Sequence, residues 1–254
     1  MSAGASFADQ FEDPRVTDQF CRKLPGTPSL ILVGVVHDHP ASIARVERIL
    51  EATHPKTLAL ELPPAAVDLY RREACRSAPP ERVGGEMTAA IRAATVNTQS
   101  AAENERPVTP EIVGIDGPNL SMIRRLCTRV LTERISLETT RRLLSSLRRA
   151  TGTAVSCRVA ATVSNATATT LTEPSLEYSC SPTDPPATQA THERNHVAGV
   201  NLFLDQGGSS ATDYRDEARE ASMIERLESV RNDGPVVAIV GVDHLETLAD
   251  ALAR

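Results

Sequence analysis

The sequence has few of the residues that stack on nucleic-acid bases, and it has very few lysines. Its 254 residues include no Trp, three Tyr and four Phe, and lysine occurs only at Lys23 and Lys56. The arginine doublets at 124/125, 141/142 and 148/149 lie in helix-like segments that also contain Glu, which is typical of solvated, salt-bridged helix faces. With a formal net charge of −6, these shortages argue against a nucleic-acid partner.

The sequence also shows no long apolar run, no residue pattern of a secretory leader and no closely spaced cysteine pair. The apolar stretch Leu30 to Val36 is far shorter than the roughly 20 residues of a membrane-spanning helix. The first residues, MSAGASFADQFEDP, carry acids where a secretory signal carries basic residues. The five cysteines are odd in number and form no C-x-x-C pair, which argues against a zinc ribbon or a disulfide framework. We therefore expect reduced thiols, no membrane span and a cytoplasmic location.

Strand and helix patterns alternate along much of the chain. The apolar run 30–36 is followed by helical spacing over 41–54, closed by Pro55, and by a second apolar run at 57–60, which together outline a βαβ unit. Further helices are predicted at 65–75, from 86, at 119–131, 136–150, 213–231 and 245–253, and further strands at 111–115 and 236–242. The predicted fold is α/β, with a mostly parallel central sheet flanked by helices and a Thr/Ser/Pro-rich insertion.

One segment departs from this alternation. From residue 151 to about 191 the chain is rich in Thr, Ser, Ala and Pro and shows little periodicity, so we expect an insertion, a linker or a lid over the sheet edge. The predicted organisation is therefore an N-terminal extension at 1–28, the first part of the α/β domain at 29–150, the low-complexity insertion or lid at 151–200, and the C-terminal part of the domain at 201–254.

The ends of the predicted strands carry acids and histidines. The four strands run into His37, Glu61, Asp116 and the pair Asp243-His244. Because the carboxyl ends of parallel strands share one edge of a sheet, where ligands bind, these side chains are expected at one edge, with the first and last strands close together.

A glycine stands three residues before each strand-end histidine. Gly34 and Gly241 can let a helix or a ligand approach the backbone, and with Asp243 we expect them at a substrate site.

Two histidines with carboxylates at an accessible edge suit a catalytic divalent metal such as manganese, cobalt, zinc or iron. A carboxylate that is not a ligand can then act as general base on water. Taken singly, each residue has an ordinary structural explanation. Asp116 before Gly117-Pro118 can shape a turn, and Glu61 before Pro63 can serve a helix cap.

The repeated G-x-x-H motif, Gly34 to His37 and Gly241 to His244, resembles that of the TraB/PrgY family, which is related to the Tiki metalloproteases and more distantly to erythromycin-esterase-like and ChaN-like proteins. The likeness covers roughly residues 29–131 and 213–252. Its other elements include a strand ending in Glu, found here as Glu61, and a Gly-Glu helix start, found here as Gly85-Glu86. They also include a Gly-x-Asp strand end, found here as Gly114 to Asp116. The last is an Arg-acid pair followed by an apolar residue, found here as Arg219-Glu220 with Met223.

The resemblance implies a metal-dependent hydrolase, with peptidase activity as one candidate, that acts on a peptide or small-molecule substrate with Mn, Co or Zn as cofactor. His37, His244 and Asp116 are the expected ligands, and Glu61 and Glu86 are each expected to be a ligand or a base. Gly117-Pro118 stands where the family usually has Arg after the strand-end Asp, so Arg219 is expected to orient the substrate or stabilise an oxyanion. The sequence is also compatible with a homodimer.

Two alternatives stay open. The same edge can be a non-catalytic site that sequesters a peptide or small signal molecule, with no metal or a structural one. The segment HERNH, His192 to His196, matches the zincin pattern H-E-x-x-H, although it follows a Pro/Thr-rich segment and also suits a polar helix start. His39 is expected to support the site or face solvent, and His54 to end a helix.

Overall fold

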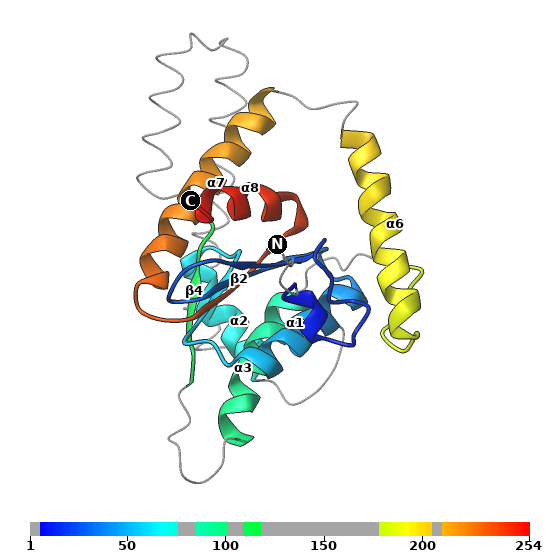
Figure 1. The fold of residues 1–254 in the computed structure, drawn as a ribbon, viewed down its shortest axis with the longest axis horizontal. Coiled ribbons are helices and arrows are strands. Elements are labelled where there is room, and N and C mark those ends of the chain that lie inside the picture. Colours follow the sequence, from blue (N-terminus) through cyan, green and yellow to red (C-terminus); the bar gives the residue numbers. More distant parts are fainter. Residues whose placement is uncertain (1–5, 76–84, 101–108, 118–177, 205–209) are drawn as a thin grey trace, which may run out of the picture.

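The computed structural model describes residues 6–75, 85–100, 109–117, 178–204 and 210–254 (Figure 1). Its centre is one five-stranded sheet in the order β1-β2-β5-β3-β4, in which β1 runs antiparallel to β2 and the other pairs are parallel. This confirms the α/β class with a mostly parallel sheet. The strands are β1 (Cys21–Leu24), β2 (Leu30–Val35), β3 (Thr57–Leu60), β4 (Glu111–Gly114) and β5 (Val236–Gly241).

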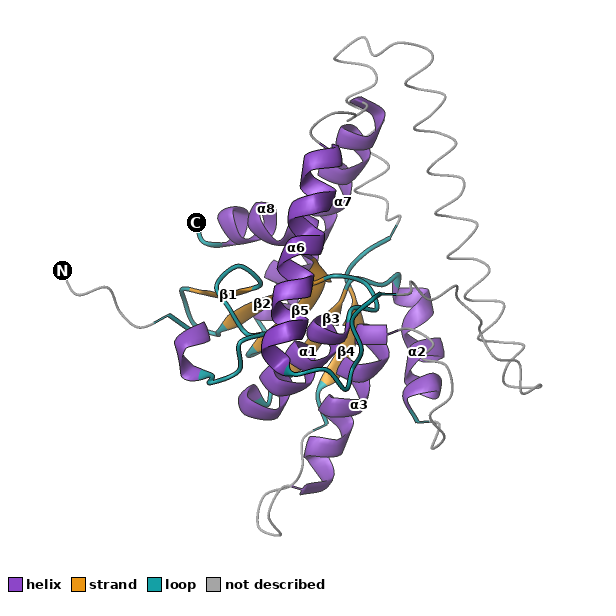
Figure 2. Cartoon of the chain, turned by 90° about the vertical axis from the view of Figure 1, so that its right-hand side faces the viewer, coloured by secondary structure: helices purple, strands orange, loops and turns teal. Residues whose placement is uncertain are grey.

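Helices cover both faces of the sheet. In Figures 1 and 2, α1, α2 and α3 lie on one side of the strands and α7 and α8 on the other, while α6 stands beside the sheet next to α1. The helices are α1 (Pro40–Thr53), α2 (Val67–Ala74), α3 (Gly85–Ser100), α6 (Pro186–Leu204), α7 (Ser210–Arg231) and α8 (Val242–Leu252), with short 3-10 turns at Ala8–Gln10 and Pro64–Ala66.

The alternation of side chains along β2 divides the interior into two cores. Ile31 and Val33 pack in a cluster that includes the apolar side of α1, whereas Leu30 and Leu32 pack in a second cluster with α7 and α8. Every residue of β2 is buried. A continuous apolar run is therefore required here, because a strand between two helical layers has no solvent face.

Local signals fix the ends of α1. His39 caps its N-terminus by accepting a hydrogen bond from the Ala41 amide, and Pro40 occupies the first turn, where its missing N–H costs nothing. At the other end His54 has a left-handed backbone with φ of +43° and precedes Pro55. The helix therefore begins directly after the loop that follows β2.

Most element boundaries agree with the sequence prediction, and three features differ. The predicted extension 1–28 contributes β1, α6 begins at Pro186 inside the predicted insertion, and Asp243 and His244 lie in the first turn of α8 rather than in a loop after β5. The helices predicted at 119–131 and 136–150, and most of the predicted insertion, lie outside the described residues.

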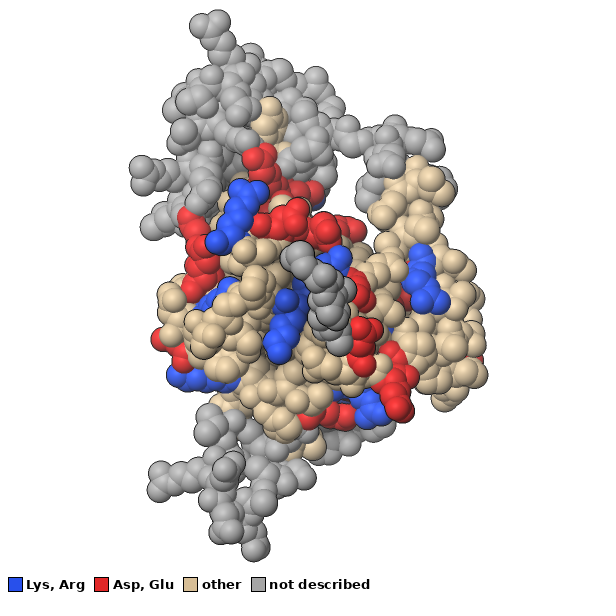
Figure 3. All heavy atoms as spheres, viewed as in Figure 1, with Lys and Arg blue, Asp and Glu red and all other residues tan. Residues whose placement is uncertain are grey.

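Two further expectations concern the thiols and the membrane. Cys21, Cys75 and Cys180, the cysteines in the described ranges, are free thiols. Among the helices of the described part, none combines the length and the apolar character needed to cross a membrane. Acidic and basic side chains are interspersed over the face drawn in Figure 3. The arginine doublets predicted to lie on salt-bridged helix faces are outside the described residues.

Candidate functional site

The strand-end residues lie at the carboxyl edge of the sheet. β2 and β5 are parallel neighbours with Val35 opposite Gly241, so the chain continues toward His37 and His244 from the same edge. The first and last predicted strands are therefore adjacent, as expected. Glu61 follows β3 directly, and Asp116 comes shortly after β4. Within this edge the side chains divide into two clusters.

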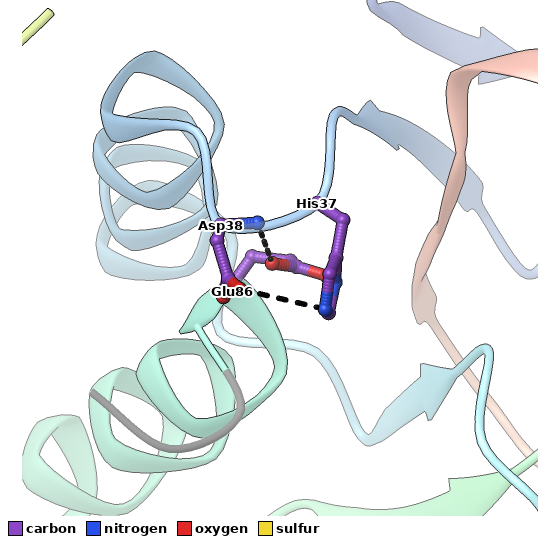
Figure 4. A group of neighbouring side chains, drawn as sticks. All are labelled: His37, Asp38 and Glu86. Atoms are coloured by element: carbon purple, nitrogen blue, oxygen red, sulfur yellow. Dashed lines mark hydrogen bonds and ion pairs between the residues drawn. The ribbon is translucent and has the colours of Figure 1, made fainter. Parts of the chain in front are cut away.

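The His37 cluster consists of His37, Asp38 and Glu86. Each offers a potential ligand atom, and these atoms all lie within 4.8 Å of one another. His37 Nδ1 lies 3.0 Å from Glu86 Oε1, the Asp38 amide donates to Glu86 Oε2 at 2.9 Å, and His37 Nε2 is 3.5 Å from Asp38 Oδ2 (Figure 4). The Glu86 side chain is 2% exposed and the His37 side chain is 52% exposed, so the cluster is buried at its Glu86 end and open to solvent at the His37 ring.

The backbone around the His37 cluster is specialised. Asp38 has a left-handed φ of +56°, a conformation that Asp tolerates better than most residues. Gly85, the first residue of α3, has a φ of +35°, and a Cβ there would lie 3.2 Å from the Asp38 Cα and collide with its carboxylate. The Gly-Glu helix start thus lets α3 approach the loop closely enough for Glu86 to reach His37.

The Arg219 cluster lies over the ends of β3, β4 and β5. Arg219, on α7, donates from Nη2 to Glu61 Oε1 at 2.7 Å and to Asp116 Oδ2 at 2.8 Å, and from Nε to Asp116 Oδ1 at 3.2 Å. Glu61 also accepts the Gly241 amide at 2.5 Å. Burial by itself lowers the pKa of the guanidinium, but the hydrogen bond and charge of Asp116, with the charge of Glu61, outweigh it and raise that pKa above its ordinary value.

The second G-x-x-H histidine belongs to the Arg219 cluster. His244 Nδ1 lies 2.9 Å from Glu220 Oε1, and its Nε2 lies 3.3 Å from Arg219 Nη1 and 3.6 Å from Glu61 Oε1. The two motif histidines therefore share one arrangement, a Glu carboxylate on Nδ1. Because a carboxylate only accepts, Nδ1 of His244 carries the hydrogen, and its Nε2 lone pair accepts from Arg219 Nη1.

The predicted ligands are thus divided. His37 lies with Asp38 and Glu86, whereas His244 and Asp116 are held around Arg219. Asp38 and Glu220 were not among the predicted site residues. The signal for both was adjacency in sequence, since Asp38 follows a motif histidine and Glu220 follows the motif arginine.

The predicted substrate-site residues have separate environments. A Cβ on Gly34 would lie 2.9 Å from Leu245 Cδ2 of α8, so this glycine permits close packing of a helix on β2. A Cβ on Gly241 would meet Glu61 Oε2 at 3.3 Å, so this one makes room for the carboxylate. Asp243 is exposed in the first turn of α8.

A third cluster joins the HERNH segment to the loop after β2. His39 Nδ1 accepts the Ala41 amide, so its hydrogen must be on Nε2, which lies 2.9 Å from His192 Nδ1. His192 Nδ1 is therefore the acceptor, and its Nε2–H donates to Ser179 Oγ at 2.9 Å. These tautomers follow from the backbone donor at Ala41. The hydrogen bonds therefore run in one direction, from His39 through His192 to Ser179. Because the His192 nitrogen that faces Ser179 carries a hydrogen, it cannot remove the Ser179 proton.

The glutamate of HERNH is buried in an ion pair. Glu193 and Arg45 side chains are both 0% exposed and hydrogen-bonded to each other, and Glu193 also accepts the Ser42 hydroxyl at 2.5 Å. Arg45 donates further to the carbonyls of Gly34 at 2.8 Å and Arg15 at 2.6 Å. This contact set gives Glu193 a structural role between α6 and α1.

His39 makes the stability of the metal-free fold dependent on pH. Burial, together with the nearby His192, His196 and Arg45, lowers the pKa of His39 to about 4 from an ordinary value of 6.5. Between these values the unfolded chain binds a proton that the folded chain does not. The contribution of neutral His39 is therefore complete above pH 6.5 and is lost as the pH falls toward 4, which amounts to about 3 kcal/mol at most.

Urea unfolding at a series of pH values, with a chelator present, measures this loss. The control is His39→Asn, which retains a helix-capping side chain but does not titrate. Its stability curve should be flatter between pH 6.5 and 4, and equal slopes for the two proteins would contradict the assignment to His39.

No protein-family model, curated protein or solved structure matches this chain. The resemblance to the TraB/PrgY family accordingly stays a prediction that rests on the motifs.

Proposed function

We propose that the protein is a metal-dependent hydrolase whose divalent ion is held by His37, Asp38 and Glu86. The observation that carries the proposal is the convergence of one imidazole and two carboxylates within 4.8 Å at the carboxyl edge of a parallel sheet. Nitrogen and oxygen donors of this kind suit Mn, Co or Zn. A divalent ion at such a site supplies Lewis-acid activation of water and of a substrate carbonyl.

The exposure of the donors fits a catalytic site better than a closed structural one. The side chains of Asp38 and Glu86 are 12% and 2% exposed, and that of His37 is 52% exposed. Structural metal sites are surrounded by protein ligands, whereas catalytic sites leave a position accessible to water and substrate. The half-exposed imidazole leaves such an approach at the rim of the cluster.

His244 is the proposed general base. Its Nδ1–H points at Glu220, which holds the ring in one tautomer, and its Nε2 lone pair, which accepts from Arg219 Nη1 at 3.3 Å in the free protein, takes the proton once that long contact opens. Glu61 and Asp116 are engaged by Arg219, so we assign these three residues to positioning the edge and His244. The substrate class we propose is a peptide or a small molecule with a hydrolysable carbonyl, in a cytoplasmic setting.

Two matched Glu→Gln variants test the proposal. Glu86→Gln and Glu220→Gln each replace the carboxylate on Nδ1 of a motif histidine with an isosteric amide, so they differ only in which cluster is changed. We expect one equivalent of metal in the wild type by plasma mass spectrometry, little in Glu86→Gln, and retention in Glu220→Gln with strongly reduced turnover of peptides and esters in Mn, Co or Zn.

Four results would contradict this proposal in different ways. A wild type without metal, or Glu86→Gln with full metal content, removes the His37 cluster as the site. Metal loss only in Glu220→Gln favours the ligand set His37, His244 and Asp116. Metal and ligand binding without turnover in any of the three ions favours the sequestering alternative.

A further inference from the structure

The loop that carries two of the proposed ligands is held from outside the sheet by residues of the 178–204 segment. Three hydrogen-bonded anchors reach it, at Val36, His37 and His39. The Val36 amide donates to Ser42 Oγ, and the Ser42 hydroxyl in turn donates to Glu193. The His37 carbonyl accepts a hydrogen bond from Tyr178 Oη at 2.7 Å. The His39 ring donates to His192. The fourth residue of this stretch, Asp38, is held from α3 through its amide.

Tyr178 also contacts neighbouring histidines through its ring. Its ring packs edge-on against His39, with centroids 4.8 Å apart, and against His196 at 5.3 Å. Burial, with the nearby carboxylates of Asp38, Glu86 and Glu193, raises the pKa of the phenol to about 12. The hydroxyl therefore stays protonated at neutral pH and acts as the donor to the His37 carbonyl.

We propose that Tyr178 and His192 are positioning residues for the metal site, and that the HERNH segment fixes the loop bearing His37 and Asp38 without binding the metal. The inference rests on the proposed function, because it takes His37 and Asp38 as ligands. It explains why a zincin-like motif lies beside a metal-type cluster. His192 is committed to His39 and Ser179 through its two nitrogens, and Glu193 is committed to Arg45 and Ser42.

If Tyr178 and His192 are positioning residues, then removing their hydrogen bonds to the loop should weaken metal binding. Partners that orient ligands without touching the metal typically change its affinity by about 10- to 100-fold. Tyr178→Phe keeps the ring against His39 and removes only the hydroxyl. His192→Leu removes both hydrogen bonds, whereas His192→Gln offers one acceptor and one donor and can restore them.

The experiment is titration of each full-length, metal-free variant with Co²⁺, read by the visible absorption of the bound ion. We expect Tyr178→Phe and His192→Leu to weaken Co²⁺ binding roughly tenfold and to alter the spectrum, and His192→Gln to bind close to wild type. Asn195→Leu, a polar-to-Leu change at an exposed position of the same helix, is the matched control and should leave affinity and spectrum unchanged.

The variants separate this inference from its rivals. Abolished binding in both His192→Gln and His192→Leu would make His192 a ligand, as a zincin site requires, and would overturn the positioning role. Wild-type affinity and spectrum in Tyr178→Phe and His192→Leu would overturn it as well.

A metal-independent readout distinguishes failure of the inference from failure of the proposed function. Amide hydrogen exchange over residues 36–38, measured without metal, should be faster in His192→Leu than in Asn195→Leu. A wild type that binds no Co²⁺ refutes the metal site, and equal exchange in these two variants refutes the positioning of the loop.

Discussion

Replacing Glu193 by Gln is expected to lower the free energy of unfolding by roughly 3–5 kcal/mol, the cost of breaking a fully buried ion pair by removing one charge. The side chains of Glu193 and Arg45 are both 0% exposed. Gln is nearly the same size, so no cavity forms. The guanidinium, however, stays buried against two carbonyls and the Phe20 ring, 4.1 Å from its centroid, without a neutralising carboxylate.

Denaturant unfolding measures the effect, and an exposed ion pair within α1 offers a control. Glu51 pairs with Arg48 on α1 at 3.3 Å, but these side chains are 52% and 59% exposed. Glu51→Gln should therefore cost less than about 0.5 kcal/mol. A second comparison is the double variant Arg45→Met/Glu193→Leu. It should be more stable than Glu193→Gln, because no unpaired charge is left in the core.

The outcome also decides between two views of HERNH. If Glu193 were the general base of a zincin, Glu193→Gln would keep its stability and lose turnover. A loss below about 1 kcal/mol would contradict the structural role of the ion pair, since that is the range of exposed pairs.

The sequence was informative where local pattern and burial coincide. β2 and β5 are apolar throughout and lie between two helical layers, so their runs identified them as buried strands of a parallel sheet. Their closeness was inferred from the histidines at their ends. β1 was missed because it is short and mixed in character, with exposed Lys23 between the buried Cys21 and Leu24. Its place in the sheet depends on pairing with β2, which no local pattern encodes.

The sequence was sufficient to place the candidate residues at one edge of the sheet, but not to predict how their side chains group into separate clusters. His37, Glu61, Asp116 and His244 follow strand ends, which a reading of the chain can find. Which carboxylate meets which histidine depends on how α3 and α7 lie across that edge, and this is a property of helix packing. Tyr178 was missed for a related reason, since it lies in a stretch whose composition carries no periodicity.

Replacing Arg219 by Leu is expected to destabilise the fold by roughly 3 kcal/mol, because two largely buried carboxylates then lose a charged hydrogen-bond donor. Glu61 and Asp116 are 14% and 17% exposed, and Arg219 is 23% exposed. Nε and Nη2 of Arg219 donate to these two carboxylates in a forked geometry that Lys cannot reproduce, so Arg219→Lys should recover only part of the loss.

Arg215 is the matched control, one turn earlier on α7. Its side chain is 42% exposed and pairs with the neighbouring Asp216, so Arg215→Leu should cost less than about 1 kcal/mol in the same denaturant measurement. The comparison separates two roles for Arg219. A residue that positions the edge must reduce stability when it is removed, because its donors are already bonded in the free protein. A residue that orients substrate or stabilises an oxyanion must have N–H donors that are not hydrogen-bonded in the free protein. Its removal would therefore leave stability near that of Arg215→Leu and reduce turnover alone.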